Sequence, residues 1–364
     1  MSEYQYYELV AVDRQLSKEE MGYLRGISSR AQISSTRFCN TYNYGDLKAD
    51  PRQLLSRFFD AYVYVSNFGC KIFAIKVPRH LIDESTLLRY LLGDICTYKS
   101  SGAHWIIEFV YEDEDGYDDE WDEGDGWMGS LLNIRSELMH GDYRSLYLAW
   151  LSQLDELEPD ALSPAIPPGL DDLSASQSAL CDFLKLDTQR VVAAAQVKSD
   201  YVTVQPEVLI DQYVMQLPEA TARAQLKALL LDETGTARRE QFAALVDKAQ
   251  EIPRSSSVTV GHLLASAREL RKKADEKAMM QKQLQQQQKA ESVAANEEAY
   301  WRRVEELFEQ RGSSTVYSEL STKLGDLQLM AKMLNRQTAY DQKLAELKQR
   351  YAKKTSHWQG LRYR

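Results

Sequence analysis

The sequence predicts an α+β N-terminal domain with a largely antiparallel sheet, followed by an all-α C-terminal half with a long helix and a terminal helical hairpin. In the N-terminal part, short β-rich runs are joined by turn segments, and single capped helices lie between them. In the C-terminal part, residues 262–311 contain neither glycine nor proline, and apolar residues then recur in steps of three and four.

The expected strands carry β-branched and aromatic residues. Glycine-containing turns at Gly69 and Gly102 each lie between two such runs, and this pattern predicts two hairpins. The expected strands are residues 4–12, part of 32–42, 61–66, 71–77, 95–98 and 104–110.

Cap residues mark three helix starts. Ser17 and Glu20 have the spacing of a capping box, in which each side chain accepts a hydrogen bond from a free backbone amide. Asp50 precedes Pro51, a favoured first helical residue, and Asp83 precedes another helical pattern. The expected helices are residues 18–27, 51–59, 84–92, 128–139 and 143–154.

Proline and glycine divide the rest of the chain. Four of the nine prolines lie in residues 158–169, where proline favours a linker or an extended brace over helix or central strand. The expected segments are an α+β domain at 1–157, a Pro-rich linker at 158–170, a small helical domain at 171–253, a long charged helix at 261–311, and a helical hairpin with a basic tail at 314–364.

The long helix is polar at its centre. Its apolar stripe stops at the glutamine-rich residues 281–289, so we expect a solvated helix or a fraying hinge there. The stripe returns at Val293, Tyr300, Val304 and Leu307. Beyond it, two apolar series predict packed helices that also enclose Trp301 and Phe308. These series are Leu320, Leu324, Leu327, Ala331 and Leu334, then Tyr340, Leu344, Leu347 and Tyr351.

The composition indicates a cytoplasmic protein. Its four cysteines form no CxxC pair and are far apart, which favours free thiols in a reducing compartment. The chain starts without the features of a secretory signal, and no apolar run is long enough for a membrane span, so we expect no membrane association.

Charge is distributed unevenly. Residues 261–364 hold 20 basic and 13 acidic side chains, a net charge of +7, and the rest of the chain holds 24 and 41, a net charge of −17. An acidic body with a basic arm favours contact with itself, with its own copies, or with two different partners.

The segment from Gly124 to Gly129 matches GxGxxG, but we do not interpret it as a nucleotide site. A dinucleotide site needs this motif directly after a strand, whereas here ten acidic residues, Glu112 through Asp125, precede or enter it and would repel phosphate. The acidic run itself is a solvated loop, a docking site for a basic partner or for the chain's own basic arm, or a metal site. The EF-hand register fails because Tyr111 falls where Asp is required.

No pattern predicts a metal or an enzyme active site. The five histidines show no ligand spacing, and GxSxG, GxxxxGK[ST] and HExxH are absent from the sequence. His140 and Asp142 suit a helix end and the start of the next helix. We therefore assign no catalytic, cofactor-binding or metal-binding residue, and we expect no cofactor.

One polar cluster could bind an anion if the fold brings it together. The alternative is a charged helix face with a polar turn. The cluster is Arg25, Arg30, Arg37 and Lys48, with Ser28, Ser29, Ser34, Ser35 and Thr36.

The C-terminal tail is the expected partner-binding segment. Its basic side chains are interleaved with Tyr351, His357, Trp358 and Tyr363, which could stack on bases, and the alternative is a solvated tail without a partner. The basic residues are Lys343, Lys348, Arg350, Lys353, Lys354, Arg362 and Arg364.

Five segments resemble a bacterial protein family with no established activity, whose members are often encoded beside SWIM zinc-finger proteins. The resemblance implies a complex-forming or nucleic-acid-linked role and assigns no residue a function. It rests on residues 12–14, 24–33, 44–55, 59–69 and 260–264.

Three functions follow as hypotheses. The first is a non-enzymatic adaptor or scaffold in a cytoplasmic protein complex, with a protein partner and with a homo-oligomer compatible with the sequence. The second is a nucleic-acid-associated module that binds through its basic tail. The third is a cryptic enzyme with its site in the N-terminal domain.

Overall fold

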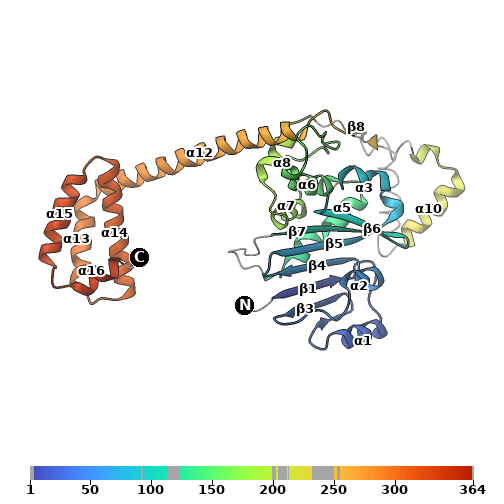
Figure 1. The fold of residues 1–364 in the computed structure, drawn as a ribbon, viewed down its shortest axis with the longest axis horizontal. Coiled ribbons are helices and arrows are strands. Elements are labelled where there is room, and N and C mark those ends of the chain that lie inside the picture. Colours follow the sequence, from blue (N-terminus) through green and yellow to red (C-terminus); the bar gives the residue numbers. More distant parts are fainter. Residues whose placement is uncertain are drawn as a thin grey trace. The chain divides into compact units, whose positions relative to one another are not determined.

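The computed structural model describes residues 4–91, 93–113, 123–198, 202–203, 211, 213–231, 250–251 and 255–362. Its contacts divide the chain into two compact units, Met1–Leu270 and Arg271–Arg364 (Figure 1). The first unit is built on a sheet and the second is helical, so the predicted α+β part and the predicted helical C-terminal half are both confirmed.

The first unit contains a seven-stranded sheet in the order β2-β3-β1-β4-β5-β7-β6. Every neighbouring pair in it is antiparallel, as the two hairpin signals predict. The strands are β1 (Gln5–Val10), β2 (Gln32–Ile33), β3 (Arg37–Tyr42), β4 (Ala61–Ser66), β5 (Cys70–Pro78), β6 (Cys96–Ser101) and β7 (His104–Glu112).

Both faces of this sheet are apolar. In β4, Val63 and Val65 enter one core, while Tyr62 and Tyr64, which alternate with them, enter another. Since successive side chains of a strand point to opposite faces, a strand buried on both sides becomes apolar throughout. All six residues of β4 are accordingly buried.

Two helices cover one face of the sheet. Helix α1 (Lys18–Ile27) contributes Leu24, and α2 (Pro51–Phe58) contributes Leu54 and Leu55 to the core on this side (Figure 1). Both predicted caps form: the Ser17 Oγ accepts from the Glu20 N–H at 3.1 Å, and the Asp50 carboxylate accepts from the Arg52 N–H at 2.8 Å.

The other face is covered by helices that follow later in the chain. Asp83 occupies the expected N-cap of α3, but its side chain makes no cap hydrogen bond, and the expected end of this helix at residue 92 lies outside the described residues. The helices are α3 (Glu84–Tyr90), α4 (Trp127–Leu131), α5 (Asn133–Met139), α6 (Arg144–Ser152), α7 (Ala175–Phe183) and α8 (Thr188–Ala195), with 3₁₀ turns at Arg79–Leu81 and Leu154–Glu156.

Helices α7 and α8 share the sheet's core rather than forming one of their own. Leu180, Phe183 and Val191 belong to the same apolar cluster as the sheet residues, which places this part of the expected helical domain in the sheet unit. The remainder of residues 171–253 is described only in part, with α10 (Glu219–Leu231) and a two-stranded pair, β8 (Val202–Thr203) and β9 (Gln250–Glu251).

The Pro-rich segment is packed along the body. Residues 163–167 are buried, and the Ser163 N–H and C=O exchange hydrogen bonds of 2.8 and 2.9 Å with Val258 and Ser256. The Tyr90 hydroxyl also donates to the Ala165 carbonyl at 3.2 Å. The prolines therefore lie in an extended brace, one of the two forms that their composition allows.

The second unit is helical and has its own core. It takes in the C-terminal end of α12 (Val260–Ala295), then α13 (Glu297–Glu309), α14 (Ser314–Met333), α15 (Gln337–Arg350) and α16 (Thr355–Arg362). Helix α14 contacts α13, α15 and α16, and the predicted apolar series supply Leu320, Leu327 and Leu347 to the core. The unit thus has more helices than the expected hairpin.

The expected helix over 261–311 is interrupted. It ends at Ala295, and Asn296, with φ −124°, precedes α13. The break does not occur in the glutamine-rich block, which is continuous helix. The break at Asn296 changes the direction of the chain, and Val304 and Phe308 of α13 then lie in the same core as Val293 of α12.

A buried ionic network ties α5 to the sheet. The Asp60 Oδ2 accepts from the backbone N–H groups of Val12 and Asp13 at 2.8 and 3.0 Å, and Oδ1 lies 3.1 Å from the Lys76 Nζ. Arg135 of α5 donates to both carboxylate oxygens of Asp13 and to the Lys76 carbonyl. With each buried charge paired, the network costs no uncompensated desolvation.

We predict that Asp60→Asn lowers the free energy of unfolding of the first unit by about 2–3 kcal/mol at neutral pH, because it leaves Lys76 buried without its partner. The measurement is calorimetric unfolding. Glu346→Gln, at an exposed position in the second unit, is the control and should leave this transition unchanged.

The free energy of unfolding of the Asp60→Asn variant should also fall less than that of the parent chain as the pH is lowered. Burial raises the pKa of Asp60, but the N–H groups of Asp13 and Val12 and the charges of Lys76 and Arg135 outweigh it, so the pKa lies below its ordinary value. A lowered folded-state pKa gives stability that is present above the unfolded value of about 3.9 and is lost as the pH falls through the folded value. An equally steep acid limb in the variant would contradict this.

Candidate functional site

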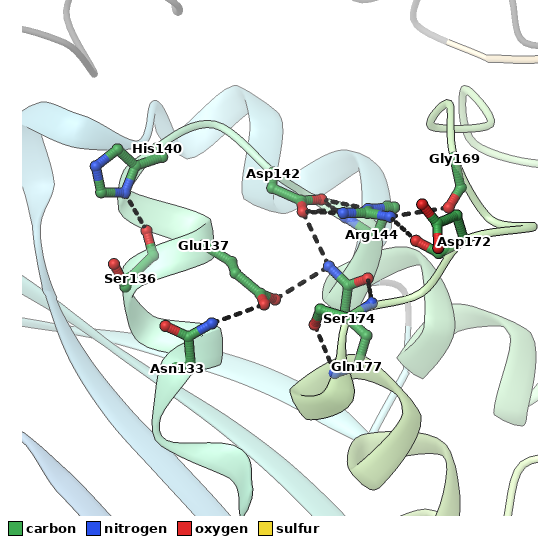
Figure 2. Close-up of polar contacts among 10 residues, drawn as sticks. All are labelled: Asn133, Ser136, Glu137, His140, Asp142, Arg144, Gly169, Asp172, Ser174 and Gln177. Carbon is green, nitrogen blue, oxygen red and sulfur yellow. Dashed lines mark hydrogen bonds and ion pairs between the residues drawn. The ribbon is translucent and has the colours of Figure 1, made fainter.

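The pair His140 and Asp142 lies at the junction of α5 and α6 (Figure 2). His140 is the C-cap residue of α5, and its Nδ1 lies 2.6 Å from the Ser136 carbonyl oxygen. The Asp142 Oδ1 accepts from the backbone N–H of Arg144 at 3.1 Å. His140 therefore lies at a helix end, as predicted. The N-cap of α6 is Tyr143, so Asp142 binds the first turn of this helix from the residue before the cap.

Arg144 connects this junction to the Pro-rich brace. Its guanidinium donates to the Asp142 carboxylate at 2.7–3.1 Å and, through Nη1, to the carbonyl oxygens of Gly169 and Asp172, both at 2.8 Å. A planar guanidinium can make these bonds on two sides at once. The Arg144 side chain is 20% exposed, so the bonds are partly shielded from water.

Gln177 completes the network from α7. Its Nε2 donates to Glu137 at 3.0 Å and to Asp142 at 2.9 Å, while its Oε1 accepts from the Ser174 N–H in a capping box (Figure 2). A hollow of about 330 Å³ borders this network beside Pro167 and Pro168. Because the Asp142 carboxylate is held by Arg144 and Gln177, the geometry is that of a structural junction rather than of a general base.

A second hollow, of about 460 Å³, lies where the end of α1, the end of β3 and the loop after β3 meet. The hydroxyl of Ser28 receives hydrogen bonds from the Asn40 Nδ2 and the Tyr42 OH, each at 3.2 Å. The Arg25 Nη1 donates to the Ser29 and Ala31 carbonyl oxygens at 3.2 and 2.6 Å, which holds the turn after α1 in place.

This hollow gathers part of the predicted anion-binding cluster. Ser28, Ser29, Arg30 and Lys48 line it. Among the residues that the structure describes, neither Arg30 nor Lys48 has a hydrogen-bonding or ion-pair partner, and both are exposed.

The rest of the predicted cluster lies elsewhere. Arg25 holds the turn, and Arg37 forms an ion pair with the buried Glu8 at 2.5 Å. Ser34, Ser35 and Thr36 do not line the hollow. Four further residues line the hollow and were not predicted from the sequence: Asn40, Thr41, Asn43 and Tyr44. The run of polar and aromatic residues before Gly45 was a usable signal for them.

Two glycines of the GxGxxG segment have backbone conformations that favour glycine. Gly124 has φ +78°, and a Cβ there would come within 2.8 Å of the Tyr6 ring; Gly126, with φ +96°, is the N-cap of α4. Helix α4 has only five residues. Most of the acidic run, residues 114–122, lies outside the described residues.

The basic tail is partly used inside the second unit. The Lys343 Nζ lies 3.0 Å from Glu297, and the Arg350 Nη1 lies 2.7 Å from Glu305, so both residues of α15 are paired with α13. The side chains of Lys348, Lys353 and Lys354 have no hydrogen-bonding or ion-pair partner in the part of the chain that the structure describes. Arg362 ends α16, and Arg364 lies outside the described residues.

Three of the tail's aromatic residues pack against Phe308 of α13. The ring centroids of Tyr351, His357 and Trp358 lie 5.0, 5.6 and 4.7 Å from that of Phe308; His357 is buried, and the other two are half-buried. Tyr351 and Trp358 thereby extend the apolar core of the second unit. Stacking of these rings on bases stays a prediction. Tyr363 lies outside the described residues.

In the described residues, no group of three or more His, Cys, Asp and Glu side chains is arranged to hold a metal ion. No helix in the same residues combines the length and apolar character that a bilayer crossing requires.

No family model, curated protein or solved structure matches this chain.

We predict that Arg144→Ala lowers the free energy of unfolding of the first unit by about 2 kcal/mol, because the brace loses two hydrogen bonds and Asp142 loses its charged partner. Urea unfolding monitored by tryptophan fluorescence measures this. Arg30→Ala, which removes an exposed guanidinium without a described partner, is the matched control and should change the value by less than about 0.5 kcal/mol. Equal effects would show that the Arg144 bridge adds nothing to stability.

Proposed function

We propose that this protein is a non-enzymatic adaptor subunit of a bacterial cytoplasmic protein complex, with each of its two units serving a different contact. The observation that carries the proposal is helix α12. Its first turns place Val260 and Leu263 in the core of the first unit, and its last turns place Ala290 and Val293 in the core of the second.

Between these ends the helix has no buried face. Every residue from 271 to 285 is exposed, including Met279 and Met280 at 65% and 74%. Helices in compact domains are stabilised chiefly by an apolar face packed on a core, and this stretch has none. A polar helix that joins two separately cored units is typical of a connector between binding modules.

An exposed apolar helix in the first unit supports a protein partner. No residue of α10 is buried, and Leu226, Leu230 and Leu231 are 57%, 78% and 70% exposed. Leu226 and Leu230 are four residues apart and so lie on one helical face. Exposed apolar surface of this kind marks interaction sites, and an apolar helix face fits a hydrophobic groove on a partner.

The resemblance to a bacterial family with a complex-forming role by genomic association points the same way. The internal ion pairs of Lys343 and Arg350, together with the packing of His357 against Phe308, favour a protein partner over nucleic acid for the second unit. The saturated Asp142 carboxylate favours binding over catalysis in the first.

The test is purification of the full-length tagged chain from its native host, with nuclease treatment, followed by mass spectrometry. We expect at least one other protein in stoichiometric amount, retained after nuclease. A monomer that co-purifies with nothing would reject the proposal, and a partner lost on nuclease treatment would favour the nucleic-acid alternative instead.

We further predict that Leu226→Asp with Leu230→Asp weakens capture of that partner by about tenfold or more, because two charges would enter a desolvated groove. Met279→Asp with Met280→Asp is the matched control, since it makes the same change at exposed positions of α12. Circular dichroism should show folding unchanged in both. Capture unaffected by the α10 change would remove α10 from the interface.

A further inference from the structure

We propose that the 460 Å³ hollow at the end of α1 binds a nucleotide, with Arg30 and Lys48 holding its phosphate and Tyr44 stacking on its base. This site is separate from the partner contacts of the adaptor function. Its chemistry is that of a mononucleotide unit, whether free in solution or within a single strand.

The charge in the hollow favours an anion. Arg30 lies on the turn after α1 and Lys48 on the loop after β3, so two cations from different segments border one space. Neither is neutralised by a described residue. The carboxylate that shares the hollow, Asp46, accepts a 2.7 Å hydrogen bond from the buried Gln5 Nε2, which holds its Oδ1. Two cations with no partner among the described residues are an arrangement that phosphate recognition uses.

The walls offer neutral hydrogen-bonding groups. Thr41 and Asn43 are exposed and line the hollow, and Ser29 adds a hydroxyl. Below them, the Asn40 and Tyr42 bonds to Ser28 fix the floor, so the hollow does not depend on the ligand for its form. Hydroxyl and amide side chains on a fixed base suit a sugar and a base edge.

Tyr44 supplies the aromatic surface. Its side chain is 78% exposed, although it lines the hollow, and it belongs to none of the three apolar cores. Gly45, which follows it, has φ +81°, a conformation that turns the loop and that other residues adopt with strain. Proteins that bind nucleotides combine an exposed ring, which stacks on the base, with cations that hold the phosphate. Tyr44 supplies the ring, and Arg30 and Lys48, which have no partner among the described residues, supply the cations.

The size of the hollow agrees with this ligand. About 460 Å³ lies within the range of about 300–1,000 Å³ of small-molecule sites, whereas a phosphate ion alone would leave most of it to water.

The experiment titrates the full-length chain with AMP, with inorganic phosphate and with an oligo-dA strand, and follows amide NMR shifts and calorimetric heat. We expect AMP to shift the amides of the loop that holds Asn43, Tyr44 and Gly45. Equal affinity for AMP and for the oligo-dA strand assigns the site to free nucleotides. Much tighter binding of the strand than of AMP assigns it to single-stranded nucleic acid.

Variants separate the two parts of the site. Arg30→Ala with Lys48→Ala should weaken binding of both AMP and phosphate by about tenfold or more, while Tyr44→Ala should weaken AMP by about tenfold and leave phosphate unchanged. Lys18→Ala, an exposed lysine of α1 outside the hollow, is the control and should change neither.

The proposal is overturned if saturating AMP shifts none of the loop amides, or if the double variant binds AMP as the parent chain does. Both results are independent of the adaptor function, because that function is tested by partner capture and by variants in α10. Since Arg30, Tyr44 and Lys48 are exposed, loss of folding is not expected in the variants, and the shifts in the parent chain provide a readout that needs no variant.

Discussion

The first unit depends on a sheet whose two faces both avoid water. β4 has no exposed residue, and its neighbours carry apolar side chains on either side, so each face needs its own cover. At about 1.5–3 kcal/mol for each large side chain fully buried, an uncovered face would cost far more than the net stability of a domain. This is why residues as distant as α7, the Pro-rich brace and the first turns of α12 join one core.

The charges that enter this sheet are paired. Glu8 meets Arg37, Glu108 meets Arg52, and Asp60 meets Lys76, each across different strands or helices. Pairing removes the penalty that an isolated buried carboxylate would carry, and it also fixes which helix lies over which strand. Arg30 and Lys48 differ from these paired charges, because neither side chain has a partner among the described residues. Both are therefore able to bind an anionic ligand.

The two units close around separate cores, and α12 takes part in both. Its polar middle contributes no side chain to either core. Ordering this stretch of backbone therefore costs conformational entropy that no apolar burial offsets. A connector role gives that stretch a use, and the exposed leucines of α10 give the first unit a surface for a partner. The basic tail, by contrast, is partly committed to the second unit, through the ion pairs of Lys343 and Arg350 with α13 and the stacking of Tyr351 on Phe308.

Local patterns in the sequence determined the elements. Runs of β-branched and aromatic residues between turns predicted the strands, the Ser17 and Asp50 caps predicted helix starts, and apolar steps of three and four predicted the C-terminal helices. Each of these signals depends on neighbours a few residues away. Only the tertiary structure decided how those elements combine. It pairs Arg37 with Glu8, places Arg30 at the hollow, includes α7 in the sheet's core and buries His357 against Phe308. Such pairings join residues far apart in the chain and depend on which surfaces the whole fold leaves uncovered.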